Sequence, residues 1–279
     1  MKVAFSPCPN DTFVFHAWVH GLIPGAPRID VKYADIDITN NLAAASKDLD
    51  VVKISYAALP WVLPDYALLP CGGALGKGCG PLLLMRNTSK LNGPAYIQNC
   101  RVAVPSERST AYLLFRLWAA QNVPGGVGEI IVLPFHEIMP AVRDGLVDIG
   151  LVIHEARFTY PSYGLALMVD LGGWWEQETN LPIPLGAIVA RRSLDLTAIA
   201  AWIRASVRYA WAHPKESKEY ILYHSQELSD EVTQAHIKLY VNEFTENISE
   251  LGYKAVATLL GKAAQEGLVP KIDWEALKY

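Results

Sequence analysis

The segment Val3–Thr12 reads VAFSPCPNDT, and in it an apolar strand passes through a short polar turn to the start of a helix. Pro7 and Pro9 end the strand, because a proline has no backbone N–H to donate to a neighbouring strand. Asp11 and Thr12 follow as candidate N-caps, since their side-chain oxygens can accept from the free amides of a first helical turn. The segment therefore predicts a β-strand joined directly to an α-helix.

The same order of strand, polar cap and helix occurs twice more in the N-terminal part of the chain. At residues 30–42 an alternating strand is followed by Thr39 as the predicted cap. At residues 49–61 an apolar strand is followed by Ser55 as the next predicted cap. Strands that alternate with helices in this way indicate an α/β protein with largely parallel sheets.

The rest of the chain continues this alternation and then becomes helical. Further strands are predicted at residues 101–105, 129–133, 148–153, 165–171 and 184–190, with helices at 110–121 and 135–143. Beyond residue 190 we expect only helices, including residues 196–212, 214–224 and 229–244. The sequence thus predicts α/β structure followed by a helical C-terminal tail.

This order of elements fits two α/β lobes between which the chain crosses twice. The crossings are predicted near Leu84–Arg86 and Pro182–Gly186. Lobe one would comprise residues 1–85 and 187–279, and lobe two residues 86–186. Two short crossovers imply a hinged substrate cleft between the lobes, where ligand pockets preferentially form.

Composition excludes several classes of protein. Of 279 residues, 51% are hydrophobic and 19% charged, which is typical of a folded α/β protein. The net charge of -4 and the scattered Lys and Arg argue against nucleic-acid binding. No apolar stretch is long enough for a signal peptide or a membrane helix, so we expect a cytoplasmic protein without membrane contact. The oligomeric state cannot be read from the sequence.

The cysteines and most histidines give little sign of a chemical site. Cys8, Cys71, Cys79 and Cys100 match no zinc-ligand spacing and are expected to be buried residues or thiols near a cleft. A catalytic role for Cys8 would need an activating base, and none can be assigned. Six of the seven histidines fall in or beside predicted helices, and we interpret these six as structural or surface residues. The sequence predicts no metal site.

The glycine-rich segment Cys71–Gly80 could be taken for a phosphate-binding loop. A nucleotide P-loop needs a Gly four residues before its Gly-Lys pair and a Ser or Thr after it. Here Cys71 precedes Gly76-Lys77 and Gly78 follows it. We therefore expect these glycines to allow positive φ angles and close backbone approach to a ligand or to the other lobe.

Two polar segments at strand ends are better candidates for binding. The segment Ser106–Thr110 lies between a strand and a helix, and its hydroxyls and amides could hold a carboxylate. Ordinary N-capping by Ser109 or Thr110 is the alternative. The segment Lys53–Ser55 occupies the equivalent strand end of lobe one, so we expect the two segments to face each other.

His154 is the one histidine predicted to lie at a strand end. The apolar strand Asp148–Ile153 leads directly to His154, Glu155 and Arg157. In open α/β sheets, ligands bind outside the carboxyl ends of the strands, and a histidine there can act as a general base near neutral pH. A structural histidine bonded to a backbone carbonyl is the alternative. Either Glu155 or Arg157 could orient the ring.

Together, four motifs in this order resemble the 1,4-dihydroxy-6-naphthoate synthase family of the futalosine route to menaquinone. The motifs are Ser6–Phe13, Lys53–Tyr56, Gly72–Gly76 and Ile153–Tyr160. The resemblance runs from about residue 3 to residue 245 and includes Leu185–Ile188. It implies a periplasmic-binding-protein type II fold and a lyase that needs no metal or organic cofactor.

The resemblance also implies a reaction and a set of site residues. Cyclic dehypoxanthine futalosine, a small-molecule carboxylate, would be converted to 1,4-dihydroxy-6-naphthoate with loss of its sugar-derived part. His154 matches the family's proton acceptor. The family's substrate-binding segments match Lys53, Ile54, Ser55, Ser109 and Thr110, although Ser109 stands where the family often has Thr.

Three more polar residues beside the strand ends are candidates for substrate contact, namely Asn10, Asp11 and Asn41. Other functions also remain open. One is chorismate dehydratase of the same pathway, and another is a non-enzymatic solute-binding protein on the same fold. The effector domain of a transcription regulator is a more distant alternative, because no helix-turn-helix segment precedes the first strand.

Overall fold

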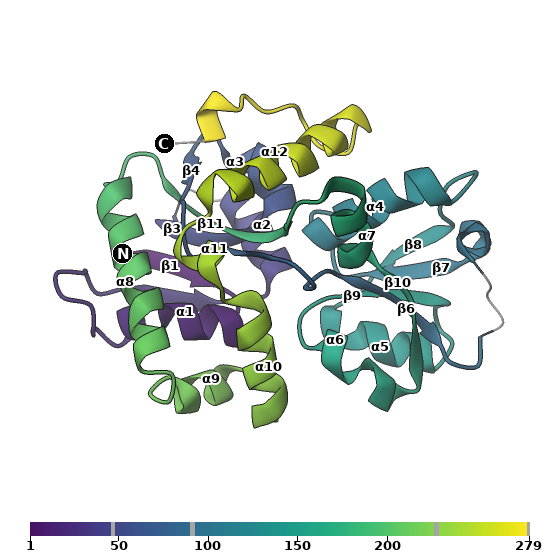
Figure 1. Cartoon of the computed structure of the whole chain (residues 1–279), viewed down its shortest axis with the longest axis horizontal. Coiled ribbons are helices and arrows are strands. Elements are labelled where there is room, and N and C mark those ends of the chain that lie inside the picture. The colour runs from purple at the N-terminus through teal and green to yellow at the C-terminus, as the bar shows by residue number, and fades with distance from the viewer. Residues whose placement is uncertain (46–47, 90–92, 226–228, 278–279) are drawn as a thin grey trace. The chain divides into compact units, whose positions relative to one another are not determined.

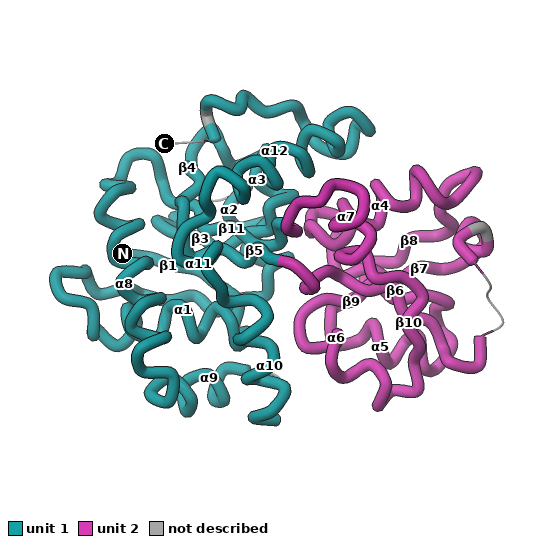
Figure 2. The backbone as a smooth tube through the Cα atoms, in the orientation of Figure 1, with its two compact units in different colours: residues 1–76, 184–279 teal, residues 77–183 magenta. Residues whose placement is uncertain are grey.

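The computed structural model describes residues 1–45, 48–89, 93–225 and 229–277. These residues form two compact units, which Figure 2 shows in different colours. Unit 1 contains residues 1–76 and 184–279, and unit 2 contains residues 77–183. Each unit has its own mixed sheet with helices on it, so the chain has mixed α/β structure.

Unit 1 contains a sheet of six strands in the order β2-β1-β3-β11-β4, with β5 paired to β11. The strands are β1 (Lys2–Phe5), β2 (Asp30–Tyr33), β3 (Val51–Ser55), β4 (Tyr66–Leu68), β5 (Ala74–Gly76) and β11 (Ile183–Arg191). β1 is parallel to β2 and to β3, whereas β11 is antiparallel to β3 and β4. The carboxyl ends of β1, β2 and β3 therefore meet at one edge of the sheet.

Both the N-terminal and the C-terminal segments of the chain supply helices to unit 1 (Figure 1). They are α1 (Pro9–Val19), α2 (Ile36–Ala45), α3 (Leu59–Val62), α8 (Leu196–Ala212), α9 (Lys218–His224), α10 (Asp230–Tyr240), α11 (Glu243–Glu246) and α12 (Ser249–Gln265). Short 3-10 turns add η1 (Tyr56–Ala58) and η4 (Glu275–Leu277). The predicted helix at residues 196–212 and the helical tail are confirmed.

The core of unit 1 is formed where α1 and α8 lie side by side against the sheet. Phe5 of β1 stacks on Phe15 of α1 with ring centroids 4.5 Å apart. Trp18 is 1% exposed, and its backbone N–H donates to the hydroxyl of Ser206 in α8. The helical tail therefore contributes to the packing that holds α1 in place.

Unit 2 contains a sheet of five strands in the order β10-β6-β9-β7-β8. The strands are β6 (Leu82–Arg86), β7 (Arg101–Val104), β8 (Glu129–Val132), β9 (Ile149–Val152) and β10 (Leu165–Asp170). The helical elements are η2 (Pro94–Asn99), α4 (Thr110–Asn122), α5 (Phe135–Arg143), α6 (Ala156–Thr159), η3 (Tyr160–Tyr163) and α7 (Leu171–Thr179). A core of buried side chains from β6, β9 and α5 holds them together.

Strand direction is where the sequence-based prediction was wrong. Both sheets are mixed, because β6, β10 and β11 run antiparallel to their neighbours. Apolar periodicity reports which residues are buried but carries no information about strand direction. Two of the parallel pairs, β1 with β3 and β7 with β9, nevertheless precede the candidate site residues.

The chain passes between the units at residues 76/77 and 183/184. The sequence predicted the passages at 85/86 and 186/187. β6, which was expected to carry the first passage, pairs with both β9 and β10 and is an inner strand of the unit 2 sheet.

Candidate active site

Lys53 and Asp11 form a buried ion pair at the carboxyl ends of β1 and β3. Lys53 Nζ lies 2.7 Å from Asp11 Oδ1 and donates to the carbonyl oxygen of Gly72 at 3.3 Å. The side chains of Lys53 and Asp11 are only 3% and 2% exposed. Two opposite charges so far from water are stable only because they pair with each other and with further polar groups.

Asp11 does not cap α1, contrary to prediction. The helix begins at Pro9, behind an extended Cys8, because the fixed φ of proline suits the first helical position. Asp11 therefore lies inside the first turn, where the positive end of the helix dipole also stabilises its carboxylate. Its oxygen accepts from Lys53 and from Asn10 Nδ2, the latter at 2.8 Å.

Ser55 is held by Asn40, a residue that the sequence reasoning missed. The Asn40 amide donates to Ser55 Oγ at 3.0 Å and accepts from the Ser55 backbone N–H at 2.7 Å. Asn40 is buried and its neighbour Asn41, the predicted candidate, is exposed. α2 begins at Ile36, so Thr39 lies inside the helix and is not its cap, contrary to prediction. Asn41 stays a candidate for substrate contact.

The Ile54 side chain belongs to the core. It is 0% exposed, so only the backbone of this residue remains available for binding. The glycine-rich segment has a related structural role, because a Cβ on Gly73 would lie 2.8 Å from the carbonyl oxygen of Gly186 in β11. A Cβ on Gly186 would lie 2.7 Å from Lys53 Cε. The glycines thus allow close approach within unit 1 and leave room for the lysine.

His236 of α10 is the second polar residue that the sequence reasoning missed. Its Nε2 lies 3.0 Å from Asn10 Oδ1, and its side chain is 1% exposed. The sequence predicts a structural or surface histidine at this position, and no local signal relates His236 to Asn10, 226 residues away. The structure therefore joins the helical tail to the predicted site residues.

In unit 2, Ser109 and Thr110 form the start of α4, after the short loop that follows β7. Ser109 Oγ accepts from the Tyr112 backbone N–H at 3.1 Å and donates to the Ser106 carbonyl at 2.9 Å. Ser109 is thus the N-cap, and Thr110 is the first residue of the 13-residue helix. Both side chains are 3% exposed. The capping that was considered as an alternative is present, and it orients the free amides of the helix.

His154 follows β9, which is parallel to β7, so its position and the start of α4 share one edge of the unit 2 sheet. Its φ angle is +53°, a left-handed conformation that costs about 1–2 kcal/mol for a residue with a side chain. The ring of Phe135 meets the imidazole edge-on, at 5.6 Å between centroids and 85° between planes. Strain of this kind persists where the surrounding structure fixes the residue, and it is concentrated at functional sites.

Arg157 holds this turn in place through hydrogen bonds to other residues of unit 2. Its guanidinium donates to the carbonyl of Gly80 at 2.8 Å and to Asp170 Oδ2 at 2.6 Å. The other oxygen of Asp170 caps α7 by accepting from the Gly172 N–H at 2.9 Å. Arg157 thus ties the segment after His154 to two other parts of unit 2.

Comparisons with known proteins show the family of this chain. Residues 1–265 match the sequence profile of a family described as menaquinone biosynthesis. The chain is 61% identical to a 1,4-dihydroxy-6-naphthoate synthase of Streptomyces coelicolor, over 100% of this chain and 98% of the relative. It belongs to the 1,4-dihydroxy-6-naphthoate synthase family of menaquinone biosynthesis. The resemblance inferred from the four motifs is therefore confirmed.

A second member of the synthase family, from Thermus thermophilus, is 45% identical over 96% of this chain and 95% of its own length. Among solved structures, protein AF1704 of Archaeoglobus fulgidus is 32% identical, with a TM-score of 0.87 over 96% of this chain and 98% of that one. The aliphatic sulphonate binding protein SsuA of Escherichia coli is 12% identical, with a TM-score of 0.70 over 100% and 91%. This last likeness shows the fold alone, and it confirms a periplasmic-binding-protein-like fold.

The four cysteines of this synthase-family chain are free and buried. Burial raises the pKa of Cys71 and of Cys79 to about 12, so neither forms a thiolate near neutral pH. Cys8 is different in its position at the N-cap of α1, where its Sγ donates to Ser6 Oγ at 2.6 Å. Among the described residues, no three His, Cys, Asp or Glu side chains gather as metal ligands would.

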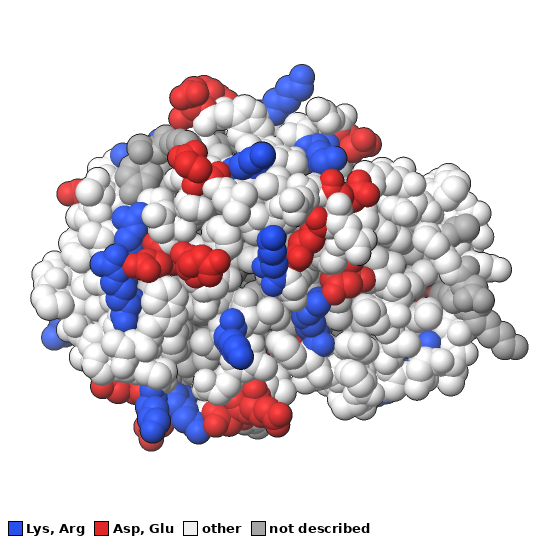
Figure 3. All heavy atoms as spheres, viewed as in Figure 1, with Lys and Arg blue, Asp and Glu red and all other residues white. Residues whose placement is uncertain are grey.

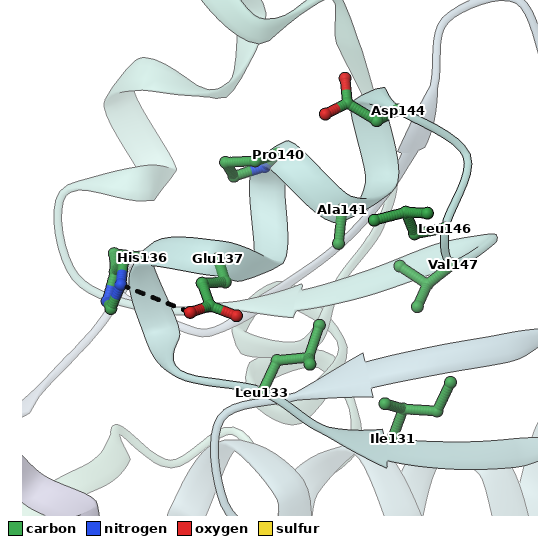
Figure 4. Close-up of a pocket in the computed structure, with 9 residues that line it drawn as sticks. All are labelled: Ile131, Leu133, His136, Glu137, Pro140, Ala141, Asp144, Leu146 and Val147. Carbon is green, nitrogen blue, oxygen red and sulfur yellow. Dashed lines mark ion pairs between the residues drawn. The ribbon is translucent and has the colours of Figure 1, made fainter.

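An open hollow of about 440 Å³ lies on the side of unit 2 formed by β8 and α5 (Figure 4). It is lined by Ile131, Leu133, His136, Glu137, Pro140, Ala141, Asp144, Leu146 and Val147. None of the predicted site residues is among them. The hollow is therefore separate from the candidate active site.

The surface carries no strong electrostatic signal on the side that Figure 3 shows. There, Lys and Arg are interspersed with Asp and Glu, in line with the net charge of -4. Within the part of the chain that the structure describes, no helix is long and apolar enough to span a membrane.

Proposed function

We propose that the protein is a lyase that converts cyclic dehypoxanthine futalosine to 1,4-dihydroxy-6-naphthoate, with His154 as the general base. The observation that carries the proposal is the position of His154, whose backbone is strained, at the carboxyl end of β9 and at the same sheet edge as the start of α4. Membership of the synthase family supports the choice of substrate and product.

The chemistry needs a base and a carboxylate site. His154 would take a proton from a substrate hydroxyl, and the neighbouring carbon–carbon bond would then break in a retro-aldol sense. The hydroxyl carbon becomes a carbonyl on the departing sugar-derived part, and the electron pair of the broken bond passes into the ring system as an enolate. The proton held by His154 then returns to this enolate, and the ring becomes aromatic with a hydroxyl group. A positioned base contributes about 10²–10⁴-fold to such a step.

The start of α4 is suited to the substrate carboxylate. Its backbone amides and the hydroxyl of Thr110 lie at the positive end of a 13-residue helix, and Ser109 orients this end by capping it. In unit 1, the ammonium of Lys53 and the hydroxyl of Ser55 lie at the carboxyl end of β3. We propose that turnover needs both sets of residues.

Product analysis tests the reaction. The purified protein is incubated with cyclic dehypoxanthine futalosine, and separately with chorismate, and the products are identified by mass spectrometry. We expect 1,4-dihydroxy-6-naphthoate from the first incubation and unchanged chorismate from the second. Dehydration of chorismate would favour the sibling enzyme. Binding of either compound without turnover would favour a solute-binding protein, and both results would overturn the proposal.

A further inference from the structure

A continuous chain of buried polar side chains leads from the helical tail to the end of β3. His236 Nε2 contacts Asn10 Oδ1 at 3.0 Å, and Asn10 Nδ2 donates to Asp11 Oδ1 at 2.8 Å. The same Asp11 oxygen accepts from Lys53 Nζ at 2.7 Å. All four side chains are at least nine-tenths buried, the most exposed being Asn10 at 6%. The chain thus joins α10, α1 and β3 away from water.

The direction of each hydrogen bond follows from the carboxylate. An ionised carboxylate only accepts, so the Asn10 amide must turn its NH₂ group toward Asp11. Its carbonyl oxygen is then directed at His236, and an amide carbonyl oxygen can only accept. Nε2 of His236 must therefore carry a proton. Asp11 in this way fixes the tautomer of His236, which is two hydrogen bonds away through Asn10.

The ammonium of Lys53 is the other end of this chain. It has three N–H donors, and among the described residues two acceptors lie within reach, Asp11 Oδ1 and the carbonyl of Gly72. A lysine side chain has four rotatable bonds, and both contacts are needed to hold its charge in one place. The third N–H is left for a ligand at the carboxyl end of β3.

We propose that His236, Asn10 and Asp11 are positioning residues that aim the ammonium of Lys53 at the substrate. The inference rests on the proposed function, in which the end of β3 binds the substrate. His236 acts through Asn10 and Asp11 and does not itself touch the substrate. The helical tail thereby contributes to substrate affinity as well as to packing.

Steady-state kinetics with cyclic dehypoxanthine futalosine test the proposal. In His236→Leu the Asn10 amide loses its fixed partner, and we expect KM to rise about tenfold, the size of one lost hydrogen bond, with kcat within about twofold of wild type. In His236→Gln the side-chain amide can again donate to Asn10, and we expect KM to return to within about twofold of wild type. A fall of kcat at constant KM, or a Gln variant no better than Leu, would overturn the proposal.

The tautomer gives a readout that does not depend on a variant folding. In ¹⁵N-histidine-labelled wild-type protein, we expect NMR spectra to show a proton on Nε2 of His236, and a proton on Nδ1 alone would overturn the chain. The two proposals can fail separately. If wild-type protein makes no naphthoate, the proposed function fails whatever the tautomer. If it makes naphthoate and His236→Leu keeps the wild-type KM, only this inference fails.

Discussion

In each unit, the carboxyl ends of two parallel strands form one edge of the sheet, and the two edges hold their polar residues in different ways. At the β1–β3 edge of unit 1, Lys53 and Asp11 are paired and buried within a chain of polar side chains. At the β7–β9 edge of unit 2, His154 is half-buried and has a strained backbone and an aromatic neighbour. The first arrangement fixes a charge, and the second fixes the direction of a ring.

This difference matches the two tasks of the proposed reaction. Binding a substrate needs charges and donors whose positions do not change, which buried partners provide. A general base must accept and return a proton, so the direction of its ring toward the substrate has to be fixed. Substitutions at one edge should therefore have different effects on stability and turnover from substitutions at the other.

The largest effect on stability is expected in unit 1. Asp11→Ala leaves the Lys53 ammonium buried without its counter-charge, and we expect the free energy of unfolding to fall by about 3–5 kcal/mol. Urea denaturation measures the change. As a control, Asp144→Ala removes an exposed partner of Arg143, and the unfolding midpoint should not move. A small loss for Asp11→Ala would contradict the importance of the buried pair.

A backbone contact behind the His154 turn should give the next effect. A Cβ on Gly80 would lie 2.1 Å from the Cα of Gly172, so Gly80→Ala forces two backbone segments of unit 2 apart. We expect a loss of about 1–3 kcal/mol in urea denaturation. Gly173→Ala is the matched control, since its nearest neighbour would be 3.7 Å away, and it should not destabilise the protein. Equal behaviour of the two variants would show that this contact is not tight.

The backbone strain at His154 predicts that a glycine at this position gives a more stable protein than an alanine. Glycine adopts a φ of +53° without the steric cost that alanine has there. We therefore expect His154→Gly to be more stable than His154→Ala by about 1 kcal/mol, while both lack the base and lose turnover. Thermal denaturation of the two variants measures the difference. A more stable alanine variant would mean that the turn relaxes and stores no strain.

The smallest effect concerns pH and unit 1. Burial, and then the neighbouring His20, lower the pKa of His16. Because its unfolded value is about 6.5, His16 contributes full stability above that pH, and its contribution is lost as the pH falls through the lower folded pKa. We expect the urea midpoint to fall between about pH 7.5 and about pH 5.5, and less so in His16→Gln. The exposed His213→Gln should keep the wild-type dependence.

Much of this organisation could be predicted from the sequence, because strand ends and helix starts are local features. The Val3–Thr12 turn, the strand before His154 and the start of α4 at Thr110 are encoded in runs of ten or so neighbouring residues. The antiparallel strands and the partners Asn40 and His236 could not be predicted in this way. They depend on contacts between residues far apart in the chain, up to 226 positions for His236 and Asn10.

The central claim is that His154, at the unit 2 edge, performs the proton transfer and that substrate binding does not depend on its imidazole. The most direct test is His154→Asn, with kcat measured at saturating cyclic dehypoxanthine futalosine and the substrate Kd measured by calorimetry. We predict a kcat lowered by about 10²–10⁴-fold and a Kd within about threefold of wild type. A folded His154→Asn variant that turns over at near the wild-type rate would contradict the account.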